Sequence, residues 1–232
     1  MSQVVAINGS PRMEKGITAP LLASFTQGMA DAGANVELYY ASALKVTPCS
    51  CGQMMCWYRT PGECCFRDDM QMLHSRLRTA DILVLATPVY IPLPGAMQDV
   101  INRLCPLVEP LLETRHGRTR VRFRDDVHIR KIVLVSTGGW WERANFDTVV
   151  RIVEELAENN GVEFAGAVLR PHAFLMEEAG ELTPDVRGVL QAARQAGREL
   201  ITEGAMRQET LEMISRPLVS EAELRTWYNR LL

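Results

Sequence analysis

Apolar positions along the chain alternate between short continuous runs and longer stretches with helical spacing. The runs predict five buried parallel strands, at residues 3–9, 35–41, 81–90, 131–139 and 162–169. The stretches between them predict helices at 17–33, 68–79, 95–112, 144–159 and 184–203. Strands that alternate with helices indicate an α/β fold, a doubly wound five-stranded parallel sheet with right-handed crossovers.

The C-terminal stretch 205–232 lies beyond the last of these helices and predicts an appended helix. Ser220 and Glu223 have the spacing of a capping box, in which each side chain bonds the other's backbone N–H. The apolar face of this helix would be formed by Leu224, Trp227, Leu231 and Leu232. We expect a main domain over residues 1–204 and a helical extension that packs on it or on a partner subunit.

Length and charge narrow the class of protein. The 232 residues, 47% of them hydrophobic, suit one α/β domain with appendages. The formal net charge of −3 argues against a dedicated nucleic-acid binder. No apolar run approaches the roughly 20 residues of a membrane span, and the N-terminus lacks the basic region and apolar core of a signal peptide. We expect a cytoplasmic protein.

Three loops follow strands at one edge of the predicted sheet, where open α/β sheets bind their ligands. The first, in NGSPRMEKGITAPLL, combines a Gly9 turn, the Ser10 hydroxyl, the Arg12 cation and a helix that starts at Thr18. Free N–H groups at a helix start favour a phosphate. The same stretch is also compatible with an ordinary capped turn that carries a surface arginine.

The other two loops carry aromatic residues. Tyr90 stands among prolines after the third strand, and Trp140 and Trp141 follow Gly138 and Gly139 after the fourth. These rings either flank a flat ligand or pack against the core, a helix or a partner subunit. Taken together, the three loops suggest a phosphate at the first, a polar chain in the middle and a planar ring between the others, as in FMN.

The stretches NGSPR…GIT, DDMQMLHSRLRTADILVLATPVY and KIVLVSTGGWWERANFD, with the tail ISRPLVSEAELRTWYN, resemble the NADPH-dependent FMN reductase and iron–sulfur flavoprotein group of the flavodoxin-like superfamily. The resemblance implies a flavodoxin-like fold with strand order 2-1-3-4-5, an FMN-binding domain over 1–204, non-covalent FMN and NAD(P)H as electron donor. By position, it assigns Ser10, Arg12, Thr18 and Ala19 to the phosphate, Pro88, Val89, Tyr90 and Ile91 to the ribityl chain and ring, and Thr137, Gly138, Gly139 and Trp140 to the isoalloxazine edge. The family often has Asn where this chain has Ile17, so the phosphate is expected to bind without help from residue 17.

Five of the six cysteines lie between Cys49 and Cys65, with the spacing C-x-C-x4-C-x7-C-C. Iron–sulfur flavoproteins bind a [4Fe–4S] cluster with a compact C-x2-C-x2-C-x4-7-C loop, which this loop resembles in position but not in spacing. The candidate ligands are Cys49, Cys51, Cys56 and Cys64. Zinc, redox-active thiols and cysteines that bind nothing are the alternatives. The sixth, Cys105, is expected to be a small core residue inside a helix.

A basic stretch over residues 113–131 holds six Arg, one Lys and two His. Arg118, Arg120, Arg122 and Arg124 alternate as on one face of a strand or extended arm. This face suits the 2′-phosphate of NADPH or an acidic partner; the alternative is a solvated hairpin or a subunit contact. Its position in the chain suggests that it lies beside the ring site, where it would cover another subunit's flavin.

The sequence therefore predicts an FMN-binding oxidoreductase, an NAD(P)H-dependent reductase of the flavin or quinone type, that passes electrons to a small molecule or a redox protein. No catalytic residue is assigned: His74 is expected on a helix surface, and His172 is a candidate near the site edge. The alternatives are a flavoprotein electron carrier, with or without a [4Fe–4S] cluster, and a non-catalytic regulatory module on the same fold. The resemblance also implies a homodimer or homotetramer.

Overall fold

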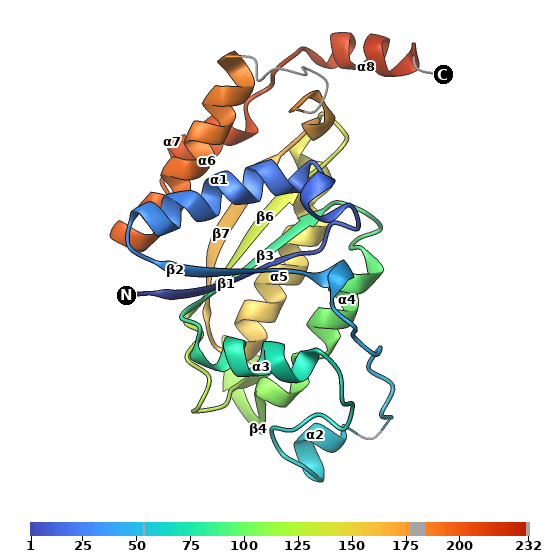
Figure 1. Cartoon of the computed structure of the whole chain (residues 1–232), viewed down its shortest axis with the longest axis vertical. Coiled ribbons are helices and arrows are strands. Elements are labelled where there is room, and N and C mark those ends of the chain that lie inside the picture. Colours follow the sequence, from blue (N-terminus) through green and yellow to red (C-terminus); the bar gives the residue numbers. More distant parts are fainter. Residues whose placement is uncertain (53, 177–183, 231–232) are drawn as a thin grey trace.

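The computed structural model describes residues 1–52, 54–176 and 184–230. Its centre is a five-stranded parallel sheet with helices on both faces (Figure 1). In spatial order the strands are β2 (Asn35–Tyr40), β1 (Gln3–Asn8), β3 (Ile82–Pro88), β6 (Lys131–Thr137) and β7 (Glu163–Arg170). Counted within this sheet alone, the order is 2-1-3-4-5, so the predicted flavodoxin-like fold is confirmed.

Strand sequence accounts for strand position. The central strands β1, β3 and β6 are nearly continuous runs of Val, Ile, Leu and Ala, and they are buried along almost their whole length. Such runs are typical of strands covered on both faces. The edge strand β2 has the sequence NVELYY and is only partly buried, because one of its sides has no neighbouring strand.

Two helical layers enclose the sheet. One layer holds α1 (Thr18–Asp31) and α6 (Pro184–Thr202), with α7 (Gln208–Ser215) beside α6 and β7. The other holds α3 (Met70–Thr79), α4 (Gly95–Asn102) and α5 (Asp147–Asn160), and α2 (Met55–Tyr58) lies beyond it. The short 3-10 helices are η1 (Met13–Lys15), η2 (Ala41–Ala43), η3 (Cys105–Leu107), η4 (Arg143–Phe146) and η5 (Ala173–Met176). None of the described helices is both long and apolar enough to cross a membrane.

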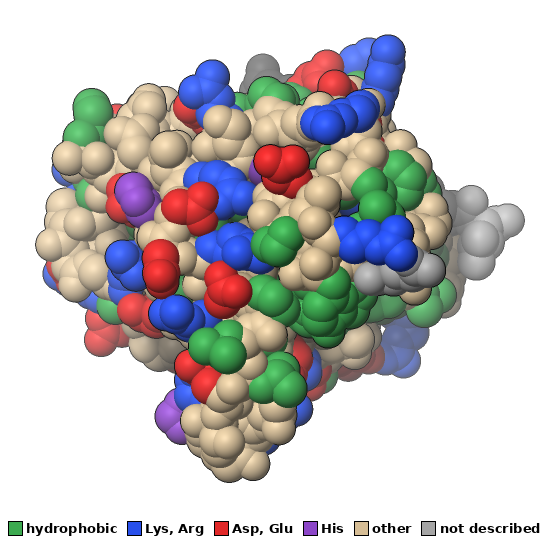
Figure 2. Space-filling view, turned by 90° about the horizontal axis from the view of Figure 1, so that it is seen from below, with side chains coloured by type: hydrophobic (Ala, Val, Ile, Leu, Met, Phe, Trp, Pro, Cys, Tyr) green, Lys and Arg blue, Asp and Glu red, His purple; other side chains and the backbone are tan. Residues whose placement is uncertain are grey.

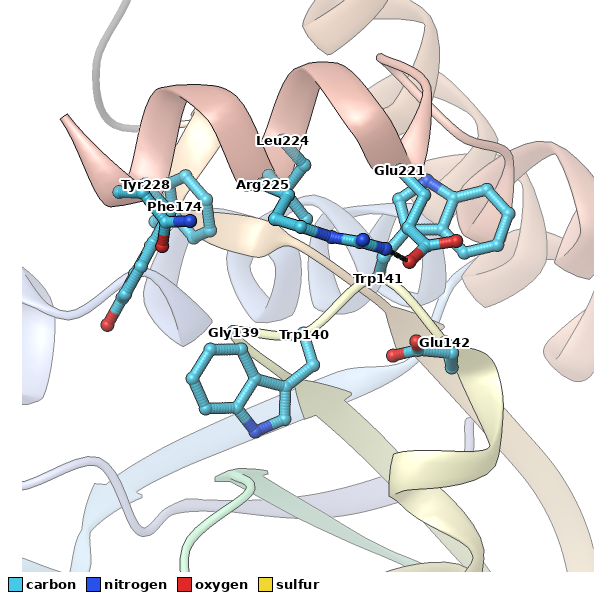
Figure 3. Close-up of a pocket in the computed structure, with 10 residues that line it drawn as sticks. Gly139, Trp140, Trp141, Glu142, Phe174, Glu221, Leu224, Arg225 and Tyr228 are labelled. Carbon is cyan, nitrogen blue, oxygen red and sulfur yellow. Dashed lines mark hydrogen bonds and ion pairs between the residues drawn. The ribbon is translucent and has the colours of Figure 1, made fainter.

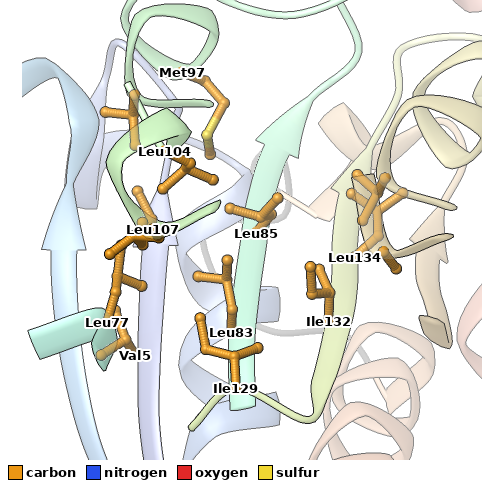
Figure 4. Packing of buried hydrophobic residues seen from close by; sticks show 14 of the residues in the cluster. Val5, Leu77, Leu83, Leu85, Met97, Leu104, Leu107, Ile129, Ile132 and Leu134 are labelled. Atoms are coloured by element: carbon orange, nitrogen blue, oxygen red, sulfur yellow. The ribbon is translucent and has the colours of Figure 1, made fainter. Parts of the chain in front are cut away.

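Each face of the sheet has its own apolar core. In the core shown in Figure 4, Leu83, Leu85 and Ile132 from the strands meet Leu77 of α3 and Met97 of α4. Each side chain buried in this way contributes roughly 1.5–3 kcal/mol. These two cores hold the carboxyl ends of the strands, and the loops that follow them, in fixed positions.

The helix predicted over 95–112 is shorter than expected. It ends at Asn102, and the chain continues through η3 into the strand β4 (Val108–Arg115). Pro106 and Pro110 explain the difference, because proline has no N–H to donate and its ring clashes with the preceding helical turn. Cys105 therefore lies half-buried in the 3-10 helix η3. The sequence had predicted it inside the longer α-helix, which is wrong.

The basic stretch forms a hairpin of β4 and β5 (Arg118–Phe123), as one of its alternatives predicted. His116 and Gly117 occupy the turn with φ angles of 50° and 72°, a conformation that suits the twist of two antiparallel strands. Arg115 donates to the carbonyl of Glu158, near the end of α5 and thus near the amino end of β7. The predicted position beside the ring site is therefore wrong for this chain. The hairpin lies near the amino ends of the strands, whereas the ring site was predicted at their carboxyl ends.

Arginines of this hairpin pair with α5. Arg120 is buried and lies 2.8 Å from Glu155 and 3.5 Å from Glu158, and Arg118 lies 3.2 Å from Glu155. The view from below in Figure 2 shows cationic and anionic side chains intermixed on this end of the molecule. Arg118 and Arg120 therefore pair with α5, whereas Arg122, farther along the same strand, is exposed and pairs with Asp125.

The C-terminal helix α8 (Glu221–Asn229) begins with the predicted capping box. The Ser220 hydroxyl accepts from the Glu223 N–H at 3.3 Å, and Glu223 accepts from the Ser220 N–H at 2.8 Å. Leu224 is buried and Trp227 stacks on Phe174, so α8 packs on its own chain. Leu231 and Leu232 lie outside the described residues, and the helix α7 that precedes α8 was not predicted.

Candidate functional site

The loop after β1 is held in place by backbone and side-chain hydrogen bonds. Asn8 is fully buried at the end of the strand, and its Oδ1 accepts from the Ser10 N–H at 2.9 Å. Among the described atoms, its Nδ2 has no partner. A Cβ on Gly16 would lie 2.3 Å from the Ser10 Oγ, so only glycine leaves that hydroxyl its place. Asn8, Ser10 and Gly16 thus form a small polar surface next to the start of α1, which we call the cradle.

The start of α1 faces this cradle. Ile17 occupies the N-cap position and provides no side-chain hydrogen bond. The Thr18 hydroxyl lies 2.7 Å from the Thr137 hydroxyl, which joins the start of α1 to the end of β6. A helix of 14 residues carries a partial positive charge at its N-terminus, where an anion is stabilised. This arrangement can hold a phosphate group.

The loops after β3 and β6 are bonded to each other. The Val89 N–H donates to the Thr137 carbonyl at 2.8 Å, and the Ser136 hydroxyl donates to the Thr87 carbonyl at 2.8 Å. Tyr90 follows with about half of its surface exposed. Two loops fixed in this way form the sides of a slot that suits a flat ring.

These three loops enclose one cavity of about 220 Å³, which we call the edge pocket. Nine of the twelve residues predicted to contact the cofactor line it: Ser10, Arg12, Thr18, Pro88, Val89, Tyr90, Thr137, Gly138 and Gly139. The other three do not: Ala19 is half-buried behind the cradle, Ile91 is fully exposed, and Trp140 lines a neighbouring cavity. The structure thus gathers most of the predicted set, while the role of each residue remains a prediction.

Four further residues line the edge pocket, and two of them come from an unexpected place. Gly16 and Ile17 belong to the first loop, whereas Ala173 and Phe174 belong to η5, after β7. Ala173 and Phe174 could have been predicted from the sequence, because β7 ends at the same side of the sheet as β1, β3 and β6. In the loop after β7, only His172 was predicted to lie near the site.

That histidine, His172, does not line the edge pocket but holds the C-terminal segment. Its fully buried Nε2 accepts from the Leu218 N–H at 3.1 Å and from an Arg170 N–H at 2.6 Å. Arg170 also donates to the carbonyls of Ile214 and Arg216, at 2.7 and 2.8 Å. Burial, assisted by the Arg170 charge, lowers the pKa of His172 to about 4. The ring is therefore neutral at pH 7 and carries its proton on Nδ1.

The two tryptophans after β6 contact this same C-terminal segment. The Trp140 ring lies edge-on to Tyr228 of α8, with centroids 5.7 Å apart. The indole N–H of Trp141 donates to the Val219 carbonyl at 3.2 Å. The sequence left open whether this pair flanks a ligand or packs within the protein. In the structure both tryptophans pack against residues 219–228.

A buried ion pair anchors the cysteine loop, residues 44–69. The Arg103 guanidinium holds both carboxylate oxygens of Asp68, at 2.8 and 2.9 Å. Burial raises the pKa of Asp68, but these bonds and the N–H groups of Thr47 and Met70 lower it further, to about 2. His74 is buried against the Arg103 carbonyl at 2.6 Å, so its predicted surface position is wrong. Burial lowers the pKa of His74.

All six cysteines are free thiols. Trp57 of α2 donates to the Cys105 carbonyl at 2.9 Å, which places the neighbouring Cys56 in a buried position. Burial, with a contribution from the Cys105 thiol, raises the pKa of Cys56 to about 12. Within the described ranges, no three His, Cys, Asp or Glu side chains are arranged to hold a metal ion. Cys49, Cys51, Cys56 and Cys64 thus form no ready metal centre here, and their predicted role as ligands stays a prediction.

Known proteins resemble this chain over part of its length. It is 31% identical to an iron–sulfur flavoprotein of Archaeoglobus fulgidus over 118 residues, which are 50% of this chain and 51% of that protein. It is 32% identical to an iron–sulfur flavoprotein of Methanocaldococcus jannaschii over 88 residues, 38% of this chain and 44% of that protein. The matches thus span about half the length of these relatives or less.

Solved structures with the same fold include two reductases. An NAD(P)H:quinone oxidoreductase from Methanothermobacter marburgensis has a TM-score of 0.59 at 18% identity, over 86% of this chain and 96% of that one. An FMN-dependent NADH-azoreductase from Bacillus anthracis has a TM-score of 0.57 at 14% identity, over 88% and 100%. The NADPH-dependent FMN reductase family model matches residues 2–144, well over half of the chain. The chain therefore belongs to the NADPH-dependent FMN reductase family.

Proposed function

We propose that this chain binds FMN non-covalently in the edge pocket and uses NAD(P)H to reduce a small-molecule acceptor. One observation carries the proposal: in a member of the FMN reductase family, the edge pocket gathers residues from four strand ends at the start of α1. Structures of the same fold include an azoreductase in complex with FMN, which supports the cofactor. A cytoplasmic location and a homodimer or homotetramer belong to the proposal as well.

The residues present fit FMN. Ser10, Thr18 and the uncapped start of α1 would hold the phosphate, and the loops after β3 and β6 would flank the ring. The unpartnered Asn8 Nδ2 beneath the first loop supports a polar occupant nearby. When bound, FMN supplies the hydride and electron chemistry. The chain would position the cofactor and shield its ring, and no residue is assigned as general acid or base.

The experiment that tests the phosphate site is a titration of the apo-protein with FMN, followed by quenching of flavin fluorescence. Replacing Ser10 and Thr18 together by Ala should weaken binding at least tenfold, about 1.4 kcal/mol, because two hydroxyls of the cradle are lost. Glu203→Gln is the matched control and should bind like the wild type, because Glu203 is exposed after α6 and does not line the pocket. Unchanged affinity in the double variant would count against the assignment, and a wild-type protein that takes up no FMN would refute the proposal.

Two other functions remain to be separated from this one. An electron carrier with a [4Fe–4S] cluster corresponds to the names of the two relatives, although no metal-binding group of three side chains is found among the residues that the structure describes. A spectrum of anaerobically purified protein, with iron and sulfide assays, tests for the cluster. Steady-state NAD(P)H oxidation with FMN distinguishes a reductase from a regulatory module that binds flavin without turnover.

A further inference from the structure

We infer that Thr137 positions the hydroxyl of Thr18, so that this hydroxyl donates its proton to the phosphate of FMN. The inference rests on the proposed function and adds to it a residue at the end of β6 that acts on the phosphate through another side chain. The family resemblance had placed Thr137 at the isoalloxazine edge instead. The direction of its side chain, the bond that it makes and the groups around that bond support the new assignment.

The side chain of Thr137 points toward α1, because side chains along a strand alternate between the two faces of the sheet. Val133 and Val135 of β6 belong to the core that α1 and α6 share with the sheet. Leu134 belongs to the core on the other face. Thr137 continues the first series as the last residue of the strand, which brings its hydroxyl to the first turn of α1.

The residues that follow Thr137 leave the strand and form one side of the slot proposed for the ring. Gly138 and Gly139 line the edge pocket, and Trp140 then lies across a second cavity from α8 (Figure 3). The backbone of the two glycines can approach a ring closely because it carries no side chain. The contact with the ring therefore belongs to these glycines, while the Thr137 hydroxyl is engaged at the start of α1.

The hydroxyls of Thr137 and Thr18 form a buried pair. They lie 2.7 Å apart, an ordinary O–H···O distance, and the two residues are only 4% and 1% exposed. Each hydroxyl has one proton, so the bond between them uses one proton and leaves the other. Among the described residues, neither hydroxyl has a further hydrogen-bond partner. The second proton therefore needs an acceptor, since a buried donor without one is costly.

Other helical threonines show why Thr18 differs. Thr26, Thr202 and Thr226 each donate to the carbonyl four residues earlier, at 2.9, 3.0 and 2.8 Å. Thr18 is the first residue of α1, so no helical turn precedes it and no such carbonyl is in place. Its proton is thus left for a ligand that binds at the start of the helix.

The edge pocket also lacks an acidic side chain that could take this proton. Among the described residues that line it are the hydroxyls of Ser10, Thr18 and Thr137 and the cation of Arg12, but no Asp or Glu. Donors without carboxylates favour a ligand group that only accepts hydrogen bonds. A phosphate dianion is such a group, and the start of α1 favours its charge.

Thr137 therefore determines which way the Thr18 hydroxyl points. When Thr137 donates to the Thr18 Oγ1, the Thr18 proton is directed to the phosphate, where a charged acceptor makes a stronger hydrogen bond than a neutral one. Ile17 at the N-cap position provides no side-chain hydrogen bond. The threonine pair thus supplies the polar contact that residue 17 does not make, and Thr137 is a positioning residue for the phosphate.

The test titrates the full-length apo-protein with FMN and with riboflavin, which has the same ring but no phosphate. Thr137→Val keeps the shape of the side chain and removes its hydroxyl. It should raise the Kd for FMN about fivefold and leave the Kd for riboflavin at the wild-type value. Thr137→Ser keeps the hydroxyl and should restore the Kd for FMN. The phosphorus NMR signal of bound FMN should move in Thr137→Val, whereas its flavin absorption maximum should not.

Thr26→Val is the matched control in α1, because it removes a hydroxyl that does not line the edge pocket. It should leave both dissociation constants unchanged. Thr18→Val combined with Thr137→Val should bind FMN no more weakly than Thr18→Val alone, because Thr137 acts only through Thr18.

Three results would overturn the inference while the proposed function stands. They are an unchanged Kd for FMN in Thr137→Val, an equal loss of FMN and riboflavin affinity in that variant, and additive losses in the double variant. The equal loss would return Thr137 to the ring, and the additive loss would mean that it acts without Thr18. If the wild-type protein binds no FMN, the proposed function fails first and this inference fails with it.

Discussion

The edge pocket and the cysteine loop are built in opposite ways. Backbone at the ends of four parallel strands forms the edge pocket, and bonds such as Val89 to Thr137 join its loops. Residues 44–69 instead cross the surface with one short helix and depend on the buried pair Arg103–Asp68. The difference teaches that sheet topology maintains the first site at many points, whereas the second is held by a few hydrogen bonds around one buried ion pair. The two regions should therefore respond independently to mutation and to pH.

The largest effect is expected from Asp68→Asn, which keeps the side-chain shape but removes the charge. Arg103, 1% exposed, would then be a buried cation without its counterion. Breaking a buried pair in this way costs roughly 3–5 kcal/mol of unfolding free energy, to be measured by urea denaturation. The thiols of Cys56 and Cys64 should also react faster with iodoacetamide, while the Kd for FMN should stay within a factor of two.

Glu203→Gln is the control for an exposed pair, because it removes the partner of Arg207 on the surface. It should cost no more than about 0.5 kcal/mol. If Asp68→Asn lost as little unfolding free energy as Glu203→Gln, the cysteine loop would not depend on its ion pair. A parallel loss of FMN affinity in Asp68→Asn would show that the two regions are coupled.

Much of the fold was predictable because the hydrophobic pattern has a period. The five parallel strands follow from runs such as VVAI and ILVLA, which only a doubly covered sheet can bury, whereas their order was implied by the family resemblance. The helix predicted over 95–112 was too long, because the apolar spacing continues past Pro106 and Pro110 although the helix does not. The helix α7 was missed because its position is determined by tertiary contact with α6 and β7.

The candidate site was predictable to the extent that sheet topology determines it. Loops after β1, β3 and β6 meet because parallel strands end at a common edge, and nine of their predicted residues line one cavity. Trp140 was assigned to the same cavity but turns toward Tyr228, a contact across 88 residues that no local pattern reveals. The burial of His74 has the same origin, since Arg103 comes from another helix end.

The second largest effect is expected from a change in pH, which should act on the C-terminal segment held by His172 before it acts on the cysteine loop. His172 has a folded-state pKa of about 4, below the ordinary 6.5, so its contribution to stability is present above pH 6.5 and is lost as the pH falls toward 4. The full loss is on the order of 3 kcal/mol, at about 1.4 kcal/mol per pKa unit. The pKa of Asp68 is lowered from 3.8 to about 2, so the cysteine loop should keep its ion pair to a lower pH.

Tryptophan fluorescence and hydrogen exchange of residues 214–228 measure the first transition, and alkylation of Cys56 measures the second. The C-terminal segment should loosen between pH 6.5 and 4, before Cys56 becomes accessible. In His172→Gln the amide oxygen can still accept from Leu218 and Arg170 but does not titrate, so the early transition should disappear. Coincident transitions in the wild type would contradict the proposed independence.

A smaller effect is expected from the neighbouring glycines after β6. A Cβ on Gly138 would come within 2.8 Å of the fully buried Phe146 ring, whereas a Cβ on Gly139 would meet nothing within 4 Å. Gly138→Ala should cost roughly 1–3 kcal/mol, as overpacking does, and should also weaken FMN binding, because the loop beside the ring shifts. Thiol reactivity in the cysteine loop should not change.

Gly139→Ala is the matched control, one residue away in the same loop. Thermal unfolding should place it within about 0.5 kcal/mol of the wild type, as for a substitution without a packing consequence. Equal destabilisation by the two alanines would mean that backbone flexibility, and not contact with Phe146, governs this loop.

The smallest effect concerns Ile17, the position at which the family resemblance implies Asn. Ile17 adopts φ −60° and ψ −24°, a helical conformation and not the extended one of a side-chain N-cap. Asn at this position should therefore add little to the stability of α1, but its amide can donate to a phosphate in the edge pocket, which residue 17 lines. Ile17→Asn should tighten FMN binding two- to fivefold, or about 0.5–1 kcal/mol, while Ile17→Val, which keeps the apolar character, should bind FMN as the wild type does. Weaker binding in Ile17→Asn would mean that Ile17 supports the cofactor by apolar contact, and that the phosphate lies farther from the start of α1 than the cradle of Ser10 and Gly16 indicates.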